Sequence, residues 1–459
     1  MNTPIQEMSS CLIIASNFPP IQSAGVYRTL RMVKYLPVLG WSLNVLTLST
    51  DTLQQKTAID LALLDQVPND IQIYRASARF PIDTFNRAIG RDRKKTISRN
   101  ITVCPTVQSI KHTERAPSFF QQFKDRITVA FTTPDRLVGW VGKAVKLGRQ
   151  IVRGGSIDVI YSSGPEWSNH LVASRVAKGA GIPWVADFRD PWVGNTFRPG
   201  RSGDSWAGRR HRLLEQRVFQ QANIVVFNTD RARADAVSRI GGDLAQKSLV
   251  IPNGFDPEYF SNVGLPQHCG SRNLEPLKMV HAGAFYGKRN IDVLLVTIGR
   301  LKRSQRLTKN DFQLNLIGPV RPHEQRLVEE NAISDLVKLT PRMPHQDCLN
   351  QLRQADALLL VQINAPLCVP GKLYEYIALK KPVFTIAADG ATADLVISEN
   401  IGFCVDPADS SKLETGLMEL LQQHRRNKLS GTVDAIRDRY DGQQQMVLFD
   451  AALRKAIGQ

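Results

Sequence analysis

Two carboxylates flank an arginine in the segment Asp187-Phe188-Arg189-Asp190, which ends an apolar run that starts at Trp184. In an open α/β sheet, ligands bind at the carboxyl ends of the strands, so a charged segment directly after a strand is a candidate catalytic site. Asp187 or Asp190 could orient an acceptor hydroxyl or take its proton, and Arg189 could pair with either carboxylate. An ion pair that only braces the loop is the alternative, and the position at a strand end favours catalysis.

His170 lies shortly after another predicted strand end, in the segment that begins Ser162-Ser163-Gly164-Pro165. It is a further candidate catalytic residue. A histidine at the start of a helix that packs locally is an equally good interpretation of the same pattern.

Gly25 leads from a loop of small residues into a helix that carries Arg28. Such a loop at a helix N-terminus is suited to an anion, although an ordinary turn is the alternative. The loop lacks the G-x-G-x-x-G spacing, so a standard dinucleotide site is not predicted.

A second glycine-rich segment follows the first apolar run of the second half of the chain. Gly283 allows a ligand to approach the backbone, and the segment continues through Tyr286 to Lys288 and Arg289. These two cations open the next helix and could bind a diphosphate.

The segment Pro370-Gly371-Lys372-Leu373 begins a short helix that also contains Glu375. Its first amides and Lys372 could hold phosphate oxygens, and Glu375, one turn further, could accept hydrogen bonds from ribose hydroxyls. A surface glutamate at a helix start is the alternative. These residues, together with Pro344, form one predicted donor-binding set. Its members are Gly25, Gly283, Tyr286, Lys288, Arg289, Pro344, Gly371, Lys372, Leu373 and Glu375.

Short apolar runs alternate with helical patterns along the whole chain, which predicts an α/β protein with doubly wound parallel sheets. The predicted strands are 11–16, 44–49, 71–76, 159–164, 184–189, 224–229 and 248–252, then 278–283, 313–318, 337–340, 357–362, 383–388 and 402–406. A segment rich in Gly and Pro around 262–276 predicts a boundary between two domains.

Composition limits the classes of function. The 459 residues carry a net charge of +17, of which +15 lies in residues 1–250. No apolar run is long enough for a transmembrane helix, and no signal-peptide pattern starts the chain. The six scattered cysteines predict neither disulfides nor a zinc site. The basic insertion 77–134 is either an amphipathic patch or a solvated loop.

These motifs together resemble the GT-B-fold glycosyltransferases, specifically the retaining, nucleotide-sugar-dependent enzymes of the family 4 type. The resemblance covers essentially the whole chain and rests on four segments: Pro19–Gly25, Asp187–Trp192, Val250-Ile251-Pro252-Asn253-Gly254-Phe255-Asp256, and Pro370–Tyr376 with Lys381-Pro382-Val383.

The resemblance implies two Rossmann-like domains that face a cleft. Residues 1–262 would bind the acceptor, 263–445 would bind the nucleotide sugar, and the helix in 446–459 would cross back to the first domain. The nucleotide sugar would be a co-substrate, with no metal and no other cofactor.

The chain departs from the family pattern at two positions. Leu367 stands where the family has the first of two paired glutamates, of which Glu375 matches the second. Ala284 stands where the family has an arginine for the diphosphate, and Lys372 could supply that charge. The family's active-site histidine has no clear match, with Ser163 in its neighbourhood and His170 nearby.

We therefore expect a cytoplasmic glycosyltransferase, soluble or peripheral at the inner face of a membrane, that transfers a sugar to a saccharide or lipid-linked acceptor. The basic first half would face an anionic membrane surface. A non-catalytic GT-B-like scaffold and a sugar-nucleotide 2-epimerase are the alternatives. Nucleic acid is not an expected partner, because the cations are dispersed and no aromatic platform accompanies them.

Overall fold

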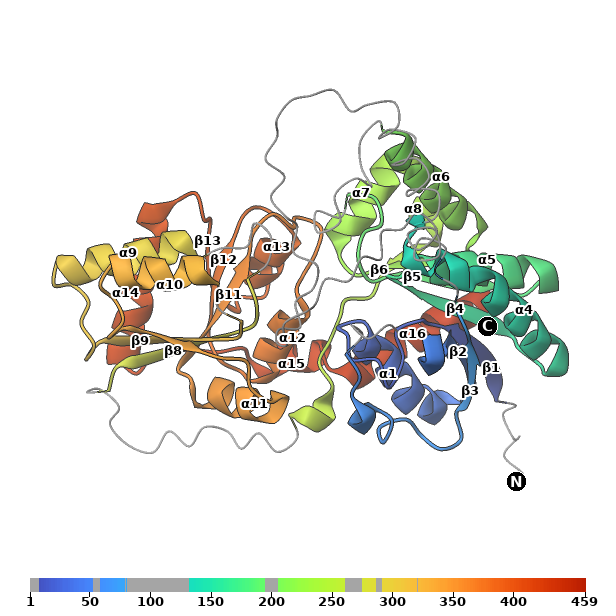
Figure 1. The fold of residues 1–459 in the computed structure, drawn as a ribbon, viewed down its shortest axis with the longest axis horizontal. Coiled ribbons are helices and arrows are strands. Elements are labelled where there is room, and N and C mark those ends of the chain that lie inside the picture. Colours follow the sequence, from blue (N-terminus) through green and yellow to red (C-terminus); the bar gives the residue numbers. More distant parts are fainter. Residues whose placement is uncertain are drawn as a thin grey trace, which may run out of the picture. The chain divides into compact units, whose positions relative to one another are not determined.

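The computed structural model describes residues 8–52, 58–78, 80, 132–194, 205–260, 275–285, 291–319 and 321–459. The chain forms two compact units (Figure 1). Unit 1 comprises Met1–Asn253 with Gln445–Gln459, and unit 2 comprises Gly254–Gln444. The sequence predicts the boundary at 262/263, and most of the predicted linker 262–276, like nearly all of the insertion 77–134, lies outside the described residues.

Within the described residues, unit 1 contains a seven-stranded parallel sheet in the order β3-β2-β1-β4-β5-β6-β7. The strand order reverses at the central strand β1, which pairs with β2 on one side and β4 on the other. This is a topological switch point, where α/β proteins place their ligands. The strands are β1 (Ser9–Ile14), β2 (Trp41–Leu48), β3 (Gln72–Ala76), β4 (Val159–Gly164), β5 (Trp184–Phe188), β6 (Ile224–Phe227) and β7 (Ser248–Val250).

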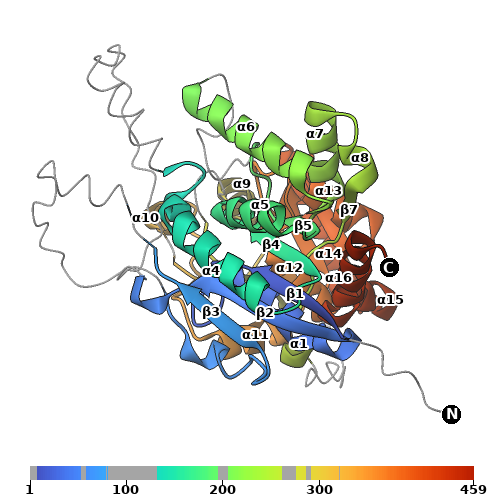
Figure 2. The same ribbon diagram turned by 90° about the vertical axis from the view of Figure 1, so that its right-hand side faces the viewer.

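Helices cover both faces of this sheet. On one face lie α4 (Val141–Gly154), α5 (Ser168–Ala180) and α6 (Trp206–Gln221), which Figure 2 shows side by side. On the other face, α1 (Val26–Tyr35) and α16 (Gly442–Ile457) share a core with the strands. The remaining elements of unit 1 are α7 (Asp230–Ile240), α8 (Leu244–Lys247) and the 3₁₀ turns η1 (Pro37–Leu39), η2 (Thr50–Thr52), η3 (Leu61–Leu63) and η4 (Arg136–Trp140).

The first helix shows how local sequence determines an element. The sequence predicts a helix from Arg28 to Leu39, with Leu30 and Val33 on its apolar stripe, and both of these residues are buried in α1. The helix ends earlier than predicted because Pro37 has no amide to donate, and a 3₁₀ turn follows. Gly40 then adopts a φ of 88°, which a residue with a side chain rarely does.

The described part of unit 2 contains a six-stranded parallel sheet in the order β10-β9-β8-β11-β12-β13. Its strand order reverses between β8 and β11. The strands are β8 (Leu277–Ala282), β9 (Phe312–Ile317), β10 (Val337–Thr340), β11 (Ala357–Gln362), β12 (Val383–Ala387) and β13 (Gly402–Val405).

Two separate apolar cores lie on the two faces of this second sheet. One core is shared with α9 (Asp292–Arg303), α10 (Pro322–Glu330) and α14 (Ser410–Arg425). The other is shared with α11 (His345–Gln354), α12 (Gly371–Ala378), α13 (Ala391–Ser398), α15 (Asp434–Arg439) and the turn η5 (Pro257–Tyr259). The predicted α/β class with two doubly wound parallel sheets is confirmed, and every predicted strand is present.

Candidate active site

Asp187 lies fully buried at the end of β5, inside a network of hydrogen bonds. Arg28 donates to both of its carboxylate oxygens, from Nε at 3.0 Å and from Nη2 at 2.9 Å. The Tyr161 hydroxyl donates to Oδ2 at 2.6 Å, and the Ser163 hydroxyl does so at 3.2 Å. Because these donors surround the carboxylate, the geometry makes Asp187 a structural anchor of the loop that it begins.

Arg28 extends this network to the end of unit 1. It donates to the carbonyl oxygens of Ile251 and Pro252 and to the side-chain oxygen of Asn253. Burial lowers the pKa of the Arg28 guanidinium, but the neighbouring Asp187 raises it above its ordinary value. Arg28 therefore stays charged and binds the strand-end segment 251–253 to α1.

Arg189 is also buried, and it braces two loops. Its Nη1 donates to the Gly25 carbonyl at 2.7 Å, and its Nη2 donates to the Pro165 carbonyl at 3.0 Å. A Cβ atom on Gly25 would lie 2.8 Å from both of these nitrogens. The small residue at Gly25 thus makes room for Arg189, which explains this glycine without a bound ligand.

His170 is fully buried in an aromatic cluster. Its ring stacks on Phe188 with centroids 4.7 Å apart, and Nδ1 lies 2.8 Å from the Ser162 hydroxyl. Burial lowers the pKa of His170 to about 3, so the ring is neutral at physiological pH. Nε2 faces Gly164, whose Cβ position lies 2.6 Å away. These contacts favour the local-packing interpretation of this histidine.

Asp190 differs from the other three predicted catalytic residues because it is only partly buried. It forms no hydrogen bond or ion pair with any residue that the structure describes. The loop that carries it is nevertheless fixed to α6. The Trp192 indole donates to Nδ1 of His211 at 3.0 Å, and the Val193 amide donates to Glu215 at 3.0 Å. Asp190 is therefore the carboxylate best placed to contact a substrate.

In unit 2, Lys372 and Gly283 meet at the carboxyl end of β8. Gly283 has a φ of 147°, and a Cβ atom there would overlap Nζ of Lys372. The Gly283 amide donates to Ile317 of β9 at 2.8 Å, and its carbonyl lies against Gly318. The two glycines keep this edge of the sheet free of side chains, so the Lys372 ammonium rests directly on the backbone.

Lys372 belongs to the first turn of α12, which starts after Pro370 with no side-chain cap and with Gly371 exposed. The Leu373 amide donates to the Pro370 carbonyl at 3.0 Å, so the exposed Gly371 amide is the part of this first turn that is open to an anion. Glu375 follows one turn later and is partly buried. Burial raises the pKa of the Cys348 thiol in α11, while the charge of Lys372 lowers it and that of Glu375 raises it. The charged groups of Lys372 and Glu375 therefore both lie near α11.

The other members of the predicted donor-binding set have different positions. Leu373 is completely buried in the core beneath α12, so its side chain cannot contact a ligand, and its amide donates to the Pro370 carbonyl at 3.0 Å. Pro344 is exposed and precedes the first residue of α11. Tyr286, Lys288 and Arg289 lie outside the described residues.

Sequence reasoning missed the roles of Arg28, Tyr161 and Gln362. Arg28 gave a signal, as the first of three cations, with Arg31 and Lys34, in a helix that also carries an apolar stripe. Gln362 ends the apolar strand β11, is buried, and has neither a donor nor an acceptor for its amide among the described residues. The signal in the sequence that could have marked Gln362 is its position, as a polar residue at the end of a continuous apolar run.

The chain matches known families over both units. Residues 270–432 match the family of glycosyl transferases group 1, and residues 112–254 match the glycosyl transferase 4-like domain. The chain belongs to the GT-B glycosyltransferases of the family 4 type.

Solved structures share the fold of this glycosyltransferase. HepE of Anabaena, solved in complex with UDP, is 16% identical with a TM-score of 0.59, covering 97% of this chain and 100% of HepE. Sucrose-phosphate synthase of Thermosynechococcus elongatus is 16% identical with a TM-score of 0.55, over 98% and 96% of the two chains. The lipopolysaccharide outer core galactosyltransferase WaaB, in its apo form, is 13% identical with a TM-score of 0.55, over 97% and 99%. No curated protein sequence matches.

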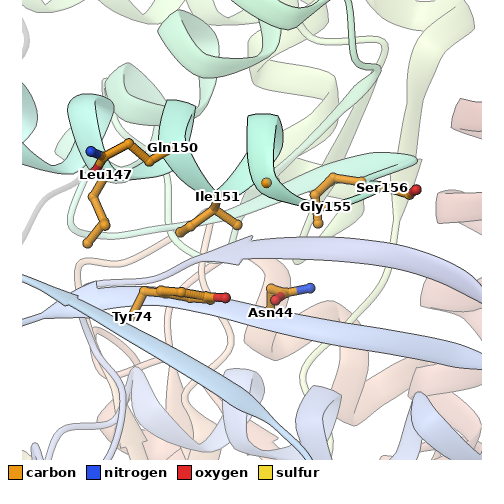
Figure 3. A pocket seen from close by; sticks show the side chains of 9 residues that line it. Asn44, Tyr74, Leu147, Gln150, Ile151, Gly155 and Ser156 are labelled. Carbon is orange, nitrogen blue, oxygen red and sulfur yellow. The ribbon is translucent and has the colours of Figure 1, made fainter.

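A pocket of this glycosyltransferase lies away from the strand ends just described. Figure 3 shows it between α4 and the strands β2 and β3, lined by Asn44, Tyr74 and Gln150 among others. Ser156 and Ile157, which also line it, precede β4. The pocket therefore lies toward the amino ends of the strands, opposite to the edge where ligands bind in this fold class.

The described residues of this glycosyltransferase contain neither a candidate metal site nor a candidate membrane span. No group of three His, Cys, Asp or Glu side chains in that part of the chain is arranged to hold a metal ion. No helix there combines the length and the apolar character needed to cross a membrane.

Proposed function

We propose that this glycosyltransferase moves a sugar from a nucleotide-sugar donor, bound by unit 2, to a saccharide or lipid-linked acceptor bound by unit 1. The observation that carries the proposal is the position of Lys372 over Gly283, beside the uncapped start of α12. A cation and the exposed start of a helix converge there at a strand-end edge. The likeness to HepE, whose structure contains UDP, supports a nucleotide as the ligand.

The chemistry requires stabilisation of the negative charge that develops on the leaving diphosphate. The Lys372 ammonium and the Gly371 amide at the start of α12 supply it through charge-assisted hydrogen bonds. Lys372 lies over the residue before Ala284, so its ammonium supplies positive charge next to the position where the family has its arginine. No divalent metal is then needed, and Lys288 and Arg289 would add to the same charge.

Glu375 would bind the ribose hydroxyls of the donor, one turn beyond the phosphate-binding start of α12. In unit 1, Asp190 would orient the acceptor hydroxyl or accept its proton, while Arg28, Asp187 and Arg189 hold its loop. The acceptor oxygen forms a bond to the anomeric carbon, and the bond from that carbon to the phosphate oxygen breaks. Its electron pair leaves with the nucleoside diphosphate, and the configuration of the sugar is retained.

The test is a transfer assay of the purified protein with UDP-, GDP- and dTDP-sugars, with proton NMR of the product. The proposal predicts nucleotide release that depends on an acceptor, a product with the anomeric configuration of the donor, and no effect of a chelator. A 2-epimerase would instead change the sugar without an acceptor. A scaffold would bind no donor, and Lys372→Met and Glu375→Gln would leave its cellular role intact.

Pathway and place in the cell belong to the same proposal. We assign the enzyme to polysaccharide or glycolipid biosynthesis, in the cytoplasm and at the inner face of the membrane. Its support is the charge of the chain, since +15 of the total +17 lies in residues 1–250. Co-sedimentation of the tagged protein with cell membranes, released by high salt, is the expected result.

A further inference from the structure

The helices α4, α5 and α6 share one face of the unit 1 sheet, and their outer surfaces carry only positive charge. Arg149 of α4 lies against Gly179 of α5, and Ser174 of α5 donates to Gln221 of α6. The three helices therefore form one continuous surface. Their exposed cations, here called the basic face, are Lys143, Lys146, Arg149, Arg153, Arg175, Lys178, Arg209, Arg210 and Arg217.

No acidic side chain balances the basic face from within these helices. Their one carboxylate, Glu215, is buried and pairs with Arg239 at 2.7 Å. Leaving Arg209 aside, none of the nine cations forms an ion pair with a described residue. In unit 2, by comparison, the exposed Arg300 and Arg306 both pair with Glu414. The basic face therefore gathers many exposed cations on helices that present no exposed carboxylate.

The helix α6 adds exposed apolar side chains to the same surface. Trp206 is 38% exposed and Leu213 is 55% exposed. They lie seven residues apart, two helical turns, on the stripe that also carries Arg210 and Arg217. The Arg210 guanidinium lies over the Trp206 ring at 5.6 Å. Tryptophan, leucine and arginine on one exposed stripe are typical of helices that lie in the interface of a lipid bilayer.

We propose that the basic face docks this protein on an anionic lipid bilayer, with Trp206 and Leu213 of α6 inserted among the headgroups. The cations meet the lipid phosphates, and the two apolar side chains leave water. A nucleic acid would satisfy the same cations but would leave Leu213 exposed, so the bilayer is the better match. The proposal rests on the membrane placement in the proposed function and deepens it, because it names the surface of unit 1 and the class of lipid that meet there. It does not depend on a nucleotide sugar.

Docking through α6 would also bring the loop that carries Asp190 to the membrane. The same helix holds that loop through two hydrogen bonds. The Trp192 indole donates to His211, and the Val193 amide donates to Glu215. The loop contains Asp190, so a helix resting on the bilayer carries this carboxylate with it. A membrane-borne acceptor would suit that arrangement.

Trp206 offers a direct readout, because the other five tryptophans, Trp41, Trp140, Trp167, Trp184 and Trp192, are all at most 1% exposed. The experiment follows fluorescence while vesicles are added, either phosphatidylcholine alone or with about one third phosphatidylglycerol. We expect a blue shift, and quenching by brominated lipid, only with the anionic vesicles. Both signals disappear in Trp206→Phe. An unchanged spectrum with anionic vesicles overturns the proposal.

Vesicle co-sedimentation with matched variants tests the charge. The triple variant Lys146→Glu, Arg153→Glu, Arg217→Glu should lose at least about 100-fold in partitioning. The control Arg303→Glu, Arg326→Glu, Lys338→Glu changes the net charge equally on exposed residues of unit 2 and should bind as the wild type does. Equal losses would overturn the proposal, as would tighter binding to RNA than to vesicles at 150 mM salt. Thermal shift with nucleotide sugars reports donor binding separately in every variant.

Discussion

Arg28 of α1 and Asp187 of β5 are paired by two hydrogen bonds, of 2.9 and 3.0 Å, although 159 residues separate them in the sequence. Both side chains are at most 2% exposed. The pair joins the first helix of unit 1 to the loop that carries Asp190, and Arg28 also binds the segment 251–253. One buried guanidinium thus orders two of the segments that resemble family motifs, Asp187–Trp192 and Val250–Asp256.

Breaking this pair should destabilise unit 1 strongly. Arg28→Met leaves the Asp187 charge buried without its main partner, so we expect a loss of about 3–5 kcal/mol in the free energy of unfolding. Urea unfolding followed by circular dichroism measures it. The double variant Arg28→Met, Asp187→Leu should recover much of the loss. A fully stable but inactive Asp187→Asn enzyme would contradict the anchoring role and restore a catalytic one.

His170 should make stability depend on pH. Burial lowers its folded pKa from 6.5 to about 3, so the unfolded chain binds this proton first as the pH falls. Stability is therefore lost from about pH 6.5 downward, by roughly 2 kcal/mol between pH 6.5 and 5. His170→Gln should remove this part of the pH dependence, measured by urea unfolding at both values. Equal pH slopes in wild type and variant would show that His170 protonates in the folded state.

Asp190→Asn should reduce kcat by about 10²–10⁴-fold without changing the melting temperature. The reason is that Asp190 has no partner among the described residues, so its substitution breaks no internal contact. Steady-state kinetics and differential scanning fluorimetry measure the two effects. The exposed Asp230→Asn, on α7 of the same unit, is the matched control and should keep full activity. Unchanged kcat in Asp190→Asn would remove this residue from the mechanism.

Gly283→Ala should weaken nucleotide binding, since the new methyl group would displace the Lys372 ammonium. The φ of 147° adds strain of about 1–3 kcal/mol, so the melting temperature should also fall. Gly142→Ala is the control, because nothing lies within 4 Å of its Cβ position, and it should leave affinity unchanged. Calorimetry with the nucleoside diphosphate compares the two. Full affinity in Gly283→Ala would mean that the position of Lys372 is unimportant.

The fold was predictable because buried parallel strands are continuous apolar runs. The strand Val159–Gly164 was predicted with its true bounds, and so was Ala357–Gln362. Strand ends also marked the polar segments worth attention. Local spacing could not assign roles to them, however, since the partner of Asp187 lies on another helix far along the chain.

The same limit applies in unit 2. The sequence put both Gly283 and Lys372 in the donor-binding set, but it gave no sign that they touch, because that contact depends on how α12 packs over the end of β8. The sequence also puts Leu373 in the donor-binding set, whereas its side chain is buried in the core beneath α12. Side-chain burial, which only the fold reveals, separates these cases.

The most direct test of the account is isothermal titration calorimetry of UDP, GDP and dTDP with wild type, Lys372→Met and Lys380→Met. Both lysines belong to the α12 segment, but Lys380 pairs with Asp434 at its far end. The account predicts that at least one nucleotide binds the wild type, that Lys372→Met weakens it by about 10–100-fold, and that Lys380→Met does not. Equal affinity in wild type and Lys372→Met, or no binding of any nucleotide to the wild type, would contradict it.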